Sequence, residues 1–183
     1  MIAAAKAKPG ALNYASAGIG SASHFAAERL RVSAGIEVQN ITFKGASEAL
    51  TEILAGRLDF TIQPLATTVM LVRDGKLSAL AVSAHRRASI LPDVPTLEEA
   101  GLRADAVYPF YTAVFVPAKT PHEIVDRLQR ETAKALQVAT VQTKLATFGV
   151  EPMPMSRDEF AKFFRDDVDA NIALVKAAGI QIQ

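Results

Sequence analysis

Up to residue 83, the apolar positions alternate between a strand-like and a helix-like spacing. The strand-like runs are residues 12–16, 38–43, 58–63 and 77–83. The runs with helical spacing lie between them, at residues 23–34, 47–55 and 66–73. Short strands and helices in alternation predict βαβ crossovers, and therefore a parallel sheet with helices on its faces.

After residue 83 the pattern becomes mainly helical. Residues 111–116 predict a fifth strand, and three Ser/Thr-x-x-Glu sequences predict capping boxes. These begin at Thr96, Thr120 and Ser156, and the last two precede long stretches of helical spacing. The expected fold class is therefore α/β: a parallel-rich sheet flanked by helices, followed by a helical C-terminal segment.

Composition and charge exclude several classes of function. The chain has 183 residues, half of them apolar, and its 20 basic against 19 acidic residues leave a formal net charge of +1. It shows no basic stripe for nucleic acid and no apolar run of the roughly 18 residues that span a membrane. Cysteine is absent, so disulfides, thiolate metal sites and cysteine nucleophiles are excluded. Three scattered histidines show no metal-ligand spacing, and no cofactor or metal is expected.

Candidate chemistry lies in the glycine-rich stretch between the first strand and the first long helix, N-Y-A-S-A-G-I-G-S-A-S-H at residues 13–24. A dinucleotide fingerprint would need a third glycine where Ser23 stands, and an acid where Lys44 follows the second strand. A nucleophile elbow would need glycine in place of Tyr14. Both interpretations are weakened, and no catalytic residue is predicted.

Anion capture is the simpler interpretation of this stretch. Successive main-chain N–H groups in a glycine turn form a concave nest, and the helix that follows directs its N-terminal dipole to the same point. Ser21 and Ser23 would add hydroxyl donors, and either could cap the helix. A tight turn with an N-cap and no ligand explains the pattern equally well, as does a packing role for His24.

Two further loops are expected beside this one, because the carboxyl ends of parallel strands share one edge of a sheet. Lys44 and Gly45 follow the second strand, and Gln63 ends the third. Lys44 would pair with an anion, and Gln63 suits a carboxylate or an amide. An exposed strand-end lysine and a helix-capping glutamine remain the alternatives.

Several motifs, in order, resemble one known family. They are L-N-Y-A-S with G-x-G-S-x-S-H at 12–24, F-K-G-A at 43–46, L-A-G-R-L-D-F at 54–60, G-K-L-x-A-L-A-V-S at 75–83, L-P-D-V-P-T-x-x-E-A-G at 91–101, and P-A-x-T-P at 117–121. In combination they are similar to the extracytoplasmic solute-binding receptors of tripartite tricarboxylate transporters, the Bug-type receptors.

The resemblance implies a two-lobed, type II periplasmic-binding-protein fold that captures di- or tricarboxylates between closing lobes. Residues 1–110 would form the second lobe. Residues 111–183 would be a crossover strand and helices that belong to or pack on the first lobe, most of which is absent. The ligand-binding residues implied are Ser16, Ala17, Gly18, Gly20, Ser21, Ser23, His24, Lys44, Gly45 and Gln63.

The resemblance also implies partners and a location. The expected partners are a small carboxylate and the membrane subunits of the transporter, with no nucleic acid. A homodimer is expected to cover the face left by the missing lobe. The location implied is the periplasm, although this chain shows no signal peptide. The alternatives are an effector-binding domain of a regulator and a nucleotide-binding α/β enzyme domain.

Overall fold

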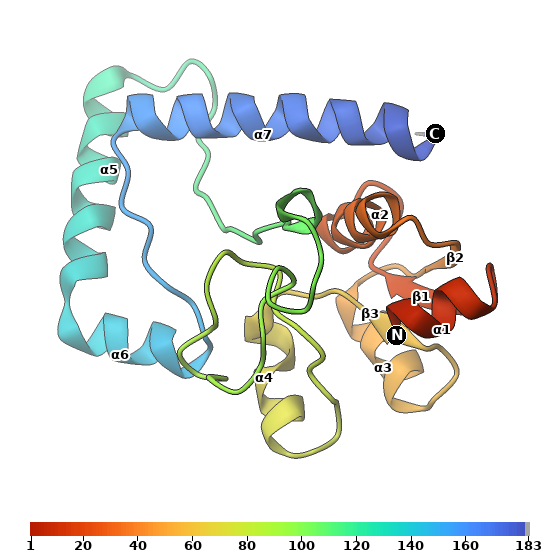
Figure 1. The fold of residues 1–183 in the computed structure, drawn as a ribbon. Helices are drawn as coiled ribbons and strands as arrows, with labels where there is room; N and C mark the ends of the chain where they lie inside the picture. Colours follow the sequence, from red (N-terminus) through yellow and green to blue (C-terminus); the bar gives the residue numbers. More distant parts are fainter. Residues whose placement is uncertain (182–183) are drawn as a thin grey trace.

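A three-stranded parallel sheet organises the first half of the chain (Figure 1). The computed structural model describes residues 1–181. The strands are β1 (Leu12–Ser16), β2 (Val38–Thr42) and β3 (Phe60–Thr61), in the order β2-β1-β3. The helices of this half are α1 (Ile2–Ala7), α2 (Ala22–Ala34), α3 (Ala46–Leu54) and α4 (Leu65–Arg73). The parallel pairing on both sides of β1 confirms the predicted βαβ arrangement.

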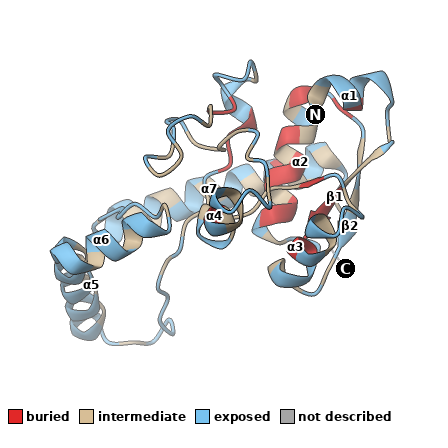
Figure 2. Ribbon diagram, turned by 90° about the horizontal axis from the view of Figure 1, so that it is seen from below, coloured by how far each residue is buried: buried red, intermediate tan, exposed pale blue. Residues whose placement is uncertain are grey.

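Helix α2 supplies much of the core because one of its faces is made of small and branched apolar residues. It begins at the N-cap Ser21, whose side chain accepts the N–H of His24, and ends at Gly35 in the left-handed conformation (φ 58°). Ala27 and Leu30 pack with Tyr14 of β1 and Phe60 of β3. Figure 2 shows the buried residues gathered on α2, β1 and α3.

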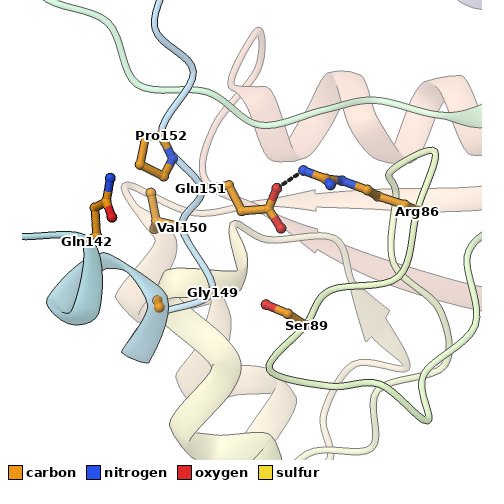
Figure 3. A pocket seen from close by; sticks show the side chains of 8 residues that line it. Arg86, Ser89, Gln142, Gly149, Val150, Glu151 and Pro152 are labelled. Atoms are coloured by element: carbon orange, nitrogen blue, oxygen red, sulfur yellow. Dashed lines mark hydrogen bonds and ion pairs between the residues drawn. The ribbon is translucent and has the colours of Figure 1, made fainter. Parts of the chain in front are cut away.

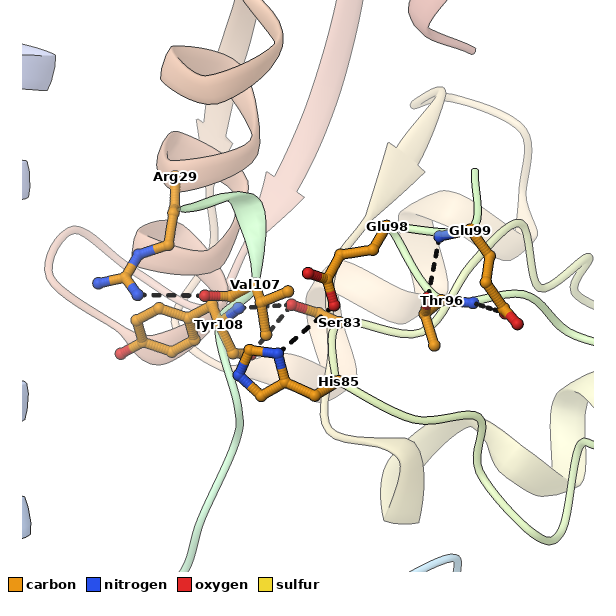
Figure 4. Close-up of polar contacts among 8 residues, drawn as sticks. All are labelled: Arg29, Ser83, His85, Thr96, Glu98, Glu99, Val107 and Tyr108. Carbon is orange, nitrogen blue, oxygen red and sulfur yellow. Dashed lines mark hydrogen bonds and ion pairs between the residues drawn. The ribbon is translucent and has the colours of Figure 1, made fainter. Parts of the chain in front are cut away.

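Two segments pack onto this core without forming strands of the sheet. Residues 77–83 were expected to be a fourth strand, and that expectation is wrong: only Val82 pairs, in an isolated bridge to Thr96. The Thr96–Glu99 capping bonds do form, at 2.8 and 3.0 Å (Figure 4). The residues that follow, 97–101, form turns and not a helix.

The C-terminal part consists of α5 (His122–Gln137), α6 (Ala139–Thr147) and α7 (Arg157–Ala178), after the 3-10 helix η1 (Ala104–Ala106). Figure 1 shows α7 lying across α2, with α5 and α6 away from the sheet. The guanidinium of Arg31 on α2 donates to the carbonyl of Ala178 at 3.1 Å. In the described part of the chain, α5 and α6 have no buried residue.

Two further predictions for the C-terminal part are wrong and one is confirmed. Residues 111–116 have no regular secondary structure and pair with no strand in the part of the chain that the structure describes. The box at Thr120 does not form, because Pro121 occupies the N-cap position of α5 and has no side-chain acceptor. The box at Ser156 is present, with reciprocal bonds to Glu159.

The link between the two parts is held by side-chain bonds (Figure 4). Ser83 accepts the N–H of Tyr108 at 2.6 Å and donates to its carbonyl at 3.2 Å. Arg29 of α2 donates to the carbonyl of Val107 at 3.1 Å and lies over the Tyr108 ring, 5.1 Å from its centroid. Residues 107 and 108 are therefore fixed to the first half of the chain.

A pair of leucine truncations tests the division between a packed first half and C-terminal helices α5 and α6 that carry no buried residue. Leu30 on α2 is 2% exposed and Leu128 on α5 is 46% exposed. Leu30→Ala should lower the free energy of unfolding by about 2–5 kcal/mol, because it removes buried methyl groups and leaves a cavity. Leu128→Ala should change it by less than about 0.5 kcal/mol. Equal losses in urea unfolding would contradict the division.

Candidate functional site

The carboxyl ends of the three strands bring the predicted loops to one edge of the sheet. Because β1 is central, the chain leaves it toward β2 and later returns on its other side at β3, so the loop after β1 lies at the point where the strand order reverses. The N–H of Phe43 donates to the carbonyl of Ser16 at 2.9 Å, and the Thr61 hydroxyl donates to the carbonyl of Ala15 at 2.8 Å. The sequence prediction that these loops meet is confirmed.

The β1–α2 loop depends on two glycines with positive φ. Gly18 has φ 125° and Gly20 has φ 77°, values that side-chain-bearing residues rarely adopt. A Cβ atom on Gly18 would lie 3.6 Å from the carbonyl oxygen of Phe43, so this turn also lies close to the end of β2. The conformation turns the main chain sharply between β1 and α2.

Three internal bonds hold the loop on the first turn of α2. The Ala17 N–H donates to the Ser23 hydroxyl at 3.0 Å, and the Gly20 N–H donates to Nδ1 of His24 at 3.0 Å. The Ser21 N–H donates to the carbonyl of Gly18 at 3.2 Å. The loop is therefore fixed by its own residues.

The serine hydroxyl hydrogens of the site are all used inside the protein. Ser21 donates to the carbonyl of Gly18 at 2.7 Å, so the 3.1 Å contact with Ser23 requires Ser23 to be the donor. Ser16, fully buried, donates to Oδ1 of Asn40 at 2.8 Å. Ser21 is the helix cap, as one sequence alternative had it. In this geometry the hydroxyl donors expected from Ser21 and Ser23 serve the loop itself.

The unused donors of the loop are main-chain N–H groups. Among residues 17–24, the N–H groups of four residues have no acceptor in the described part of the chain: Gly18, Ile19, Ala22 and Ser23. Ala22 and Ser23 are the first two residues of α2, where N–H groups lie at the positive end of the helix dipole. The Ile19 side chain at the tip of the loop is 51% exposed. The arrangement is suited to an anion that approaches the main chain.

His24 lies beneath the loop as a structural acceptor. Its ring is buried, stacks between Tyr14 and Phe25 with centroids 6.5 and 6.1 Å away, and accepts the Gly20 N–H. Burial lowers the pKa of His24, and the charge of Arg31 acts in the same direction against the opposing effect of Glu28. A neutral ring with a free lone pair on Nδ1 is what the Gly20 N–H requires.

A buried carboxylate, Glu28, lies one helical turn after His24 on α2. Glu28 accepts the Tyr14 hydroxyl at 2.8 Å and pairs with Arg31 at 2.8 Å. Burial and then the bond to Glu28 raise the pKa of Tyr14. The sequence reasoning missed Glu28 and Arg31, although their spacing from His24 places all three on one face of α2. Through Arg31, the same face contacts the C-terminal end of α7.

The remaining predicted residues lie at the rim. Lys44 is exposed at the end of β2, and its N–H donates to Glu48 at 3.1 Å. Gly45 is the N-cap residue of α3. The amide of Gln63 donates to the Thr61 hydroxyl at 3.1 Å, so one of its two N–H donors is engaged within the sheet edge.

The structure has two open hollows, one beside the β1–α2 loop and one distant from it. One, of about 480 Å³, is bounded by His24, Glu28, Arg31 and residues 178–181, with Ile19 at its margin. The other, of about 440 Å³, lies between Arg86 and residues 149–152, where Arg86 pairs with Glu151 (Figure 3). Within residues 1–181 no group of three acidic or histidine side chains is placed to hold a metal ion, and no helix is long and apolar enough to cross a membrane.

The burial of neutral His24 predicts a pH dependence of stability. Because its pKa in the folded state lies below the unfolded value of about 6.5, the unfolded state binds more protons as the pH falls past that value. The free energy of unfolding should therefore fall between about pH 7 and pH 5. His24→Gln keeps an acceptor for Gly20 and should flatten this dependence in urea titrations. Identical pH dependences for the two proteins would show that His24 is not buried neutral.

Comparison with known proteins identifies the family. The model of one protein family, described as "Tripartite tricarboxylate transporter family receptor", matches residues 1–180. A protein from Cupriavidus necator, encoded in the gbd 5' region, is 31% identical over 179 residues, which cover 98% of this chain and 54% of that protein. Protein BugT of Bordetella pertussis is 28% identical over 183 residues, 100% of this chain and 56% of BugT. The chain thus spans about half the length of these relatives.

Solved structures show the same fold. Rpa4515 of R. palustris, solved with adipate, has a TM-score of 0.85 at 29% identity, with 98% of this chain and 60% of that one covered. MatC from Rhodopseudomonas palustris, solved with bound malate, has a TM-score of 0.80 at 27% identity, with 95% and 60% covered. The periplasmic binding protein BugD scores 0.83 at 25% identity. The chain therefore belongs to the tripartite tricarboxylate transporter receptor family, whose members are solute-binding receptors and not enzymes.

Proposed function

We propose that this chain captures one carboxylate group of a small di- or tricarboxylate in the β1–α2 loop. The observation that carries the proposal is the set of four main-chain N–H groups without acceptors, at Gly18, Ile19, Ala22 and Ser23. Adipate and malate, the ligands of two related structures, are both dicarboxylates. Their chemistry supports assigning the same class of ligand to this loop.

The chemistry of the loop favours a carboxylate over a neutral solute. A carboxylate offers two oxygens with about four lone-pair sites, matching a cluster of several N–H donors. Bonds from N–H groups to an ionised oxygen are stronger than those to a neutral one, and the N-terminus of α2 adds favourable potential. The exposed Lys44 adds a positive charge at the same edge of the sheet.

The second carboxylate of such a ligand would be held outside this loop. We assign residues 1–110 to the lobe that carries the loop, and residues 111–183 to a crossover and helices that serve the other lobe. Closure of the two lobes would then be driven by contacts that the ligand makes only in the closed state. By family membership, the location proposed is the periplasm and the partners proposed are the membrane subunits of the transporter.

A single proline substitution tests the loop. Ala22 is the first residue of α2, a position where proline is well tolerated, and its N–H has no internal partner. Ala22→Pro should therefore preserve the fold but remove one donor and obstruct its place, weakening adipate or malate binding by about 10-fold or more in calorimetry.

The matched control is Ala139→Pro, at the first residue of α6. It makes the same change at a helix start far from the sheet edge, and should leave binding unchanged. NADP tests the nucleotide-binding alternative. Equal effects of the two prolines, or heat with NADP and none with either dicarboxylate, would contradict the proposal.

A further inference from the structure

The C-terminal end of α7 is bonded to the last turn of α2, the helix on which α7 packs (Figure 1). Helix α7 ends at Gly179 in the left-handed conformation, and the carbonyl of Ala178, its last residue, accepts an N–H of Arg31 at 3.1 Å. Carbonyl groups at the end of a helix lack partners within the helix and carry its partial negative charge. The guanidinium of Arg31 supplies both a donor and the opposite charge.

The same guanidinium holds a buried carboxylate. Its Nε donates to Oε2 of Glu28 at 2.8 Å, while Oε1 of Glu28 accepts the Tyr14 hydroxyl at 2.8 Å. The Glu28 side chain is 8% exposed, and an ionised carboxylate buried to this extent requires a paired cation. Because the N–H groups of a guanidinium have fixed directions, the position of the Ala178 carbonyl constrains the Glu28 carboxylate through Arg31.

From Glu28 the contacts continue to the tip of the β1–α2 loop. Tyr14, whose hydroxyl is held by Glu28, is fully buried and stacks with His24 at 6.5 Å between ring centroids. His24 in turn accepts the Gly20 N–H at 3.0 Å. The open hollow of about 480 Å³ borders His24, Glu28 and Arg31, so on that side polar contacts, and not close packing, hold these three side chains.

We propose that Arg31 is a positioning residue for the β1–α2 loop, which makes the geometry of the loop depend on how the end of α7 lies on α2. Displacement of the Ala178 carbonyl turns the guanidinium away from Glu28. The His24 ring is then free to rotate toward the hollow, and the Gly20 N–H loses its acceptor. The consequence for carboxylate affinity rests on the proposed function, whereas the positioning role itself does not.

A purely stabilising role is the alternative, and Arg29 on the same helix is an example of it. Arg29 donates to the carbonyl of Val107 at 3.1 Å, the same length as the bond from Arg31 to Ala178. Its guanidinium also lies over the Tyr108 ring, so its contacts lead to the link between the two parts of the chain and not to the loop. Arg29 is therefore the matched control for Arg31.

Arg31→Met gives the first test, with the loop amides and the His24 ring observed by NMR without ligand. The Gly20 amide should exchange about 10-fold faster or more, and the ¹⁵N signal of His24 Nδ1 should shift as it loses its hydrogen bond. Arg29→Met removes the same kind of cation and a bond of the same length, and should leave both signals unchanged. Equal effects of the two substitutions, or no effect of Arg31→Met, would overturn the proposal.

A glycine substitution tests the end of α7 while both charges of the buried pair remain. Gly179→Ala strains this end, because its φ of 68° disfavours a side chain, and should speed exchange of the Gly20 amide about threefold or more. Gly75→Ala, after α4, imposes the same strain at φ 69°, with open space for the Cβ atom at both positions. It should leave Gly20 exchange unchanged. The positioning role fails if Gly179→Ala also leaves it unchanged.

Adipate affinity extends the test to the proposed function. Arg31→Met should weaken adipate binding about fivefold or more in calorimetry, and most of this loss should disappear in a protein that already carries His24→Gln. Additive losses would show that Arg31 does not act through His24, and would overturn the positioning role. Absence of adipate heat with the unaltered chain would count against carboxylate capture alone, because the Gly20 and His24 signals are read without ligand.

Discussion

The bond from the Gly20 N–H to His24 is the interaction on which the site depends. It ties the tip of the glycine loop to the first turn of α2, and the parallel bond from Ala17 to Ser23 ties its base. With those donors engaged, the loop keeps one shape, in which the other N–H groups remain free. This bond requires His24 to be neutral, because a protonated ring has no acceptor for the Gly20 N–H.

The packed core and the candidate site lie in the same half of the chain. The packed core lies around α2 and β1, and it holds the β1–α2 loop at the edge of a rigid sheet (Figure 2). The C-terminal helices bury little of their own apolar surface. Among the C-terminal helices in the described part of the chain, α7 makes the most contact with the first half: it packs on α2, and the carbonyl of Ala178 at its end accepts from Arg31. In a two-lobed receptor, this long helix would connect α2, which begins at the end of the β1–α2 loop, to the other lobe.

Much of the first half was predictable from the sequence, because its signals are local. The bounds of β1 agree with the predicted 12–16, and Gly35 ends α2 where a left-handed residue is needed. Residues 111–116 show the limit of such reasoning. Their alternation is that of a strand, but a strand exists only with a partner, and side-chain periodicity carries no information about whether one is present.

The site was predictable only in outline. That the loops after β1, β2 and β3 meet follows from parallel topology. The direction of each serine hydroxyl cannot be derived in this way. Ser21 and Ser23 have the same side chain, and their roles depend on small differences in distance within the folded loop. The same holds for His24, whose burial depends on Tyr14 and Phe25 on either side of it.

The most direct test of the central claim is to observe the main-chain amides of the loop during a titration with adipate, using ¹⁵N-labelled protein and NMR. Carboxylate capture predicts that the largest shifts occur at Gly18, Ile19, Ala22 and Ser23, with little change at the internally bonded Ala17 and Gly20. Shifts confined to the hollow beside Arg31 or to the C-terminal helices, with the loop amides unmoved, would contradict the account.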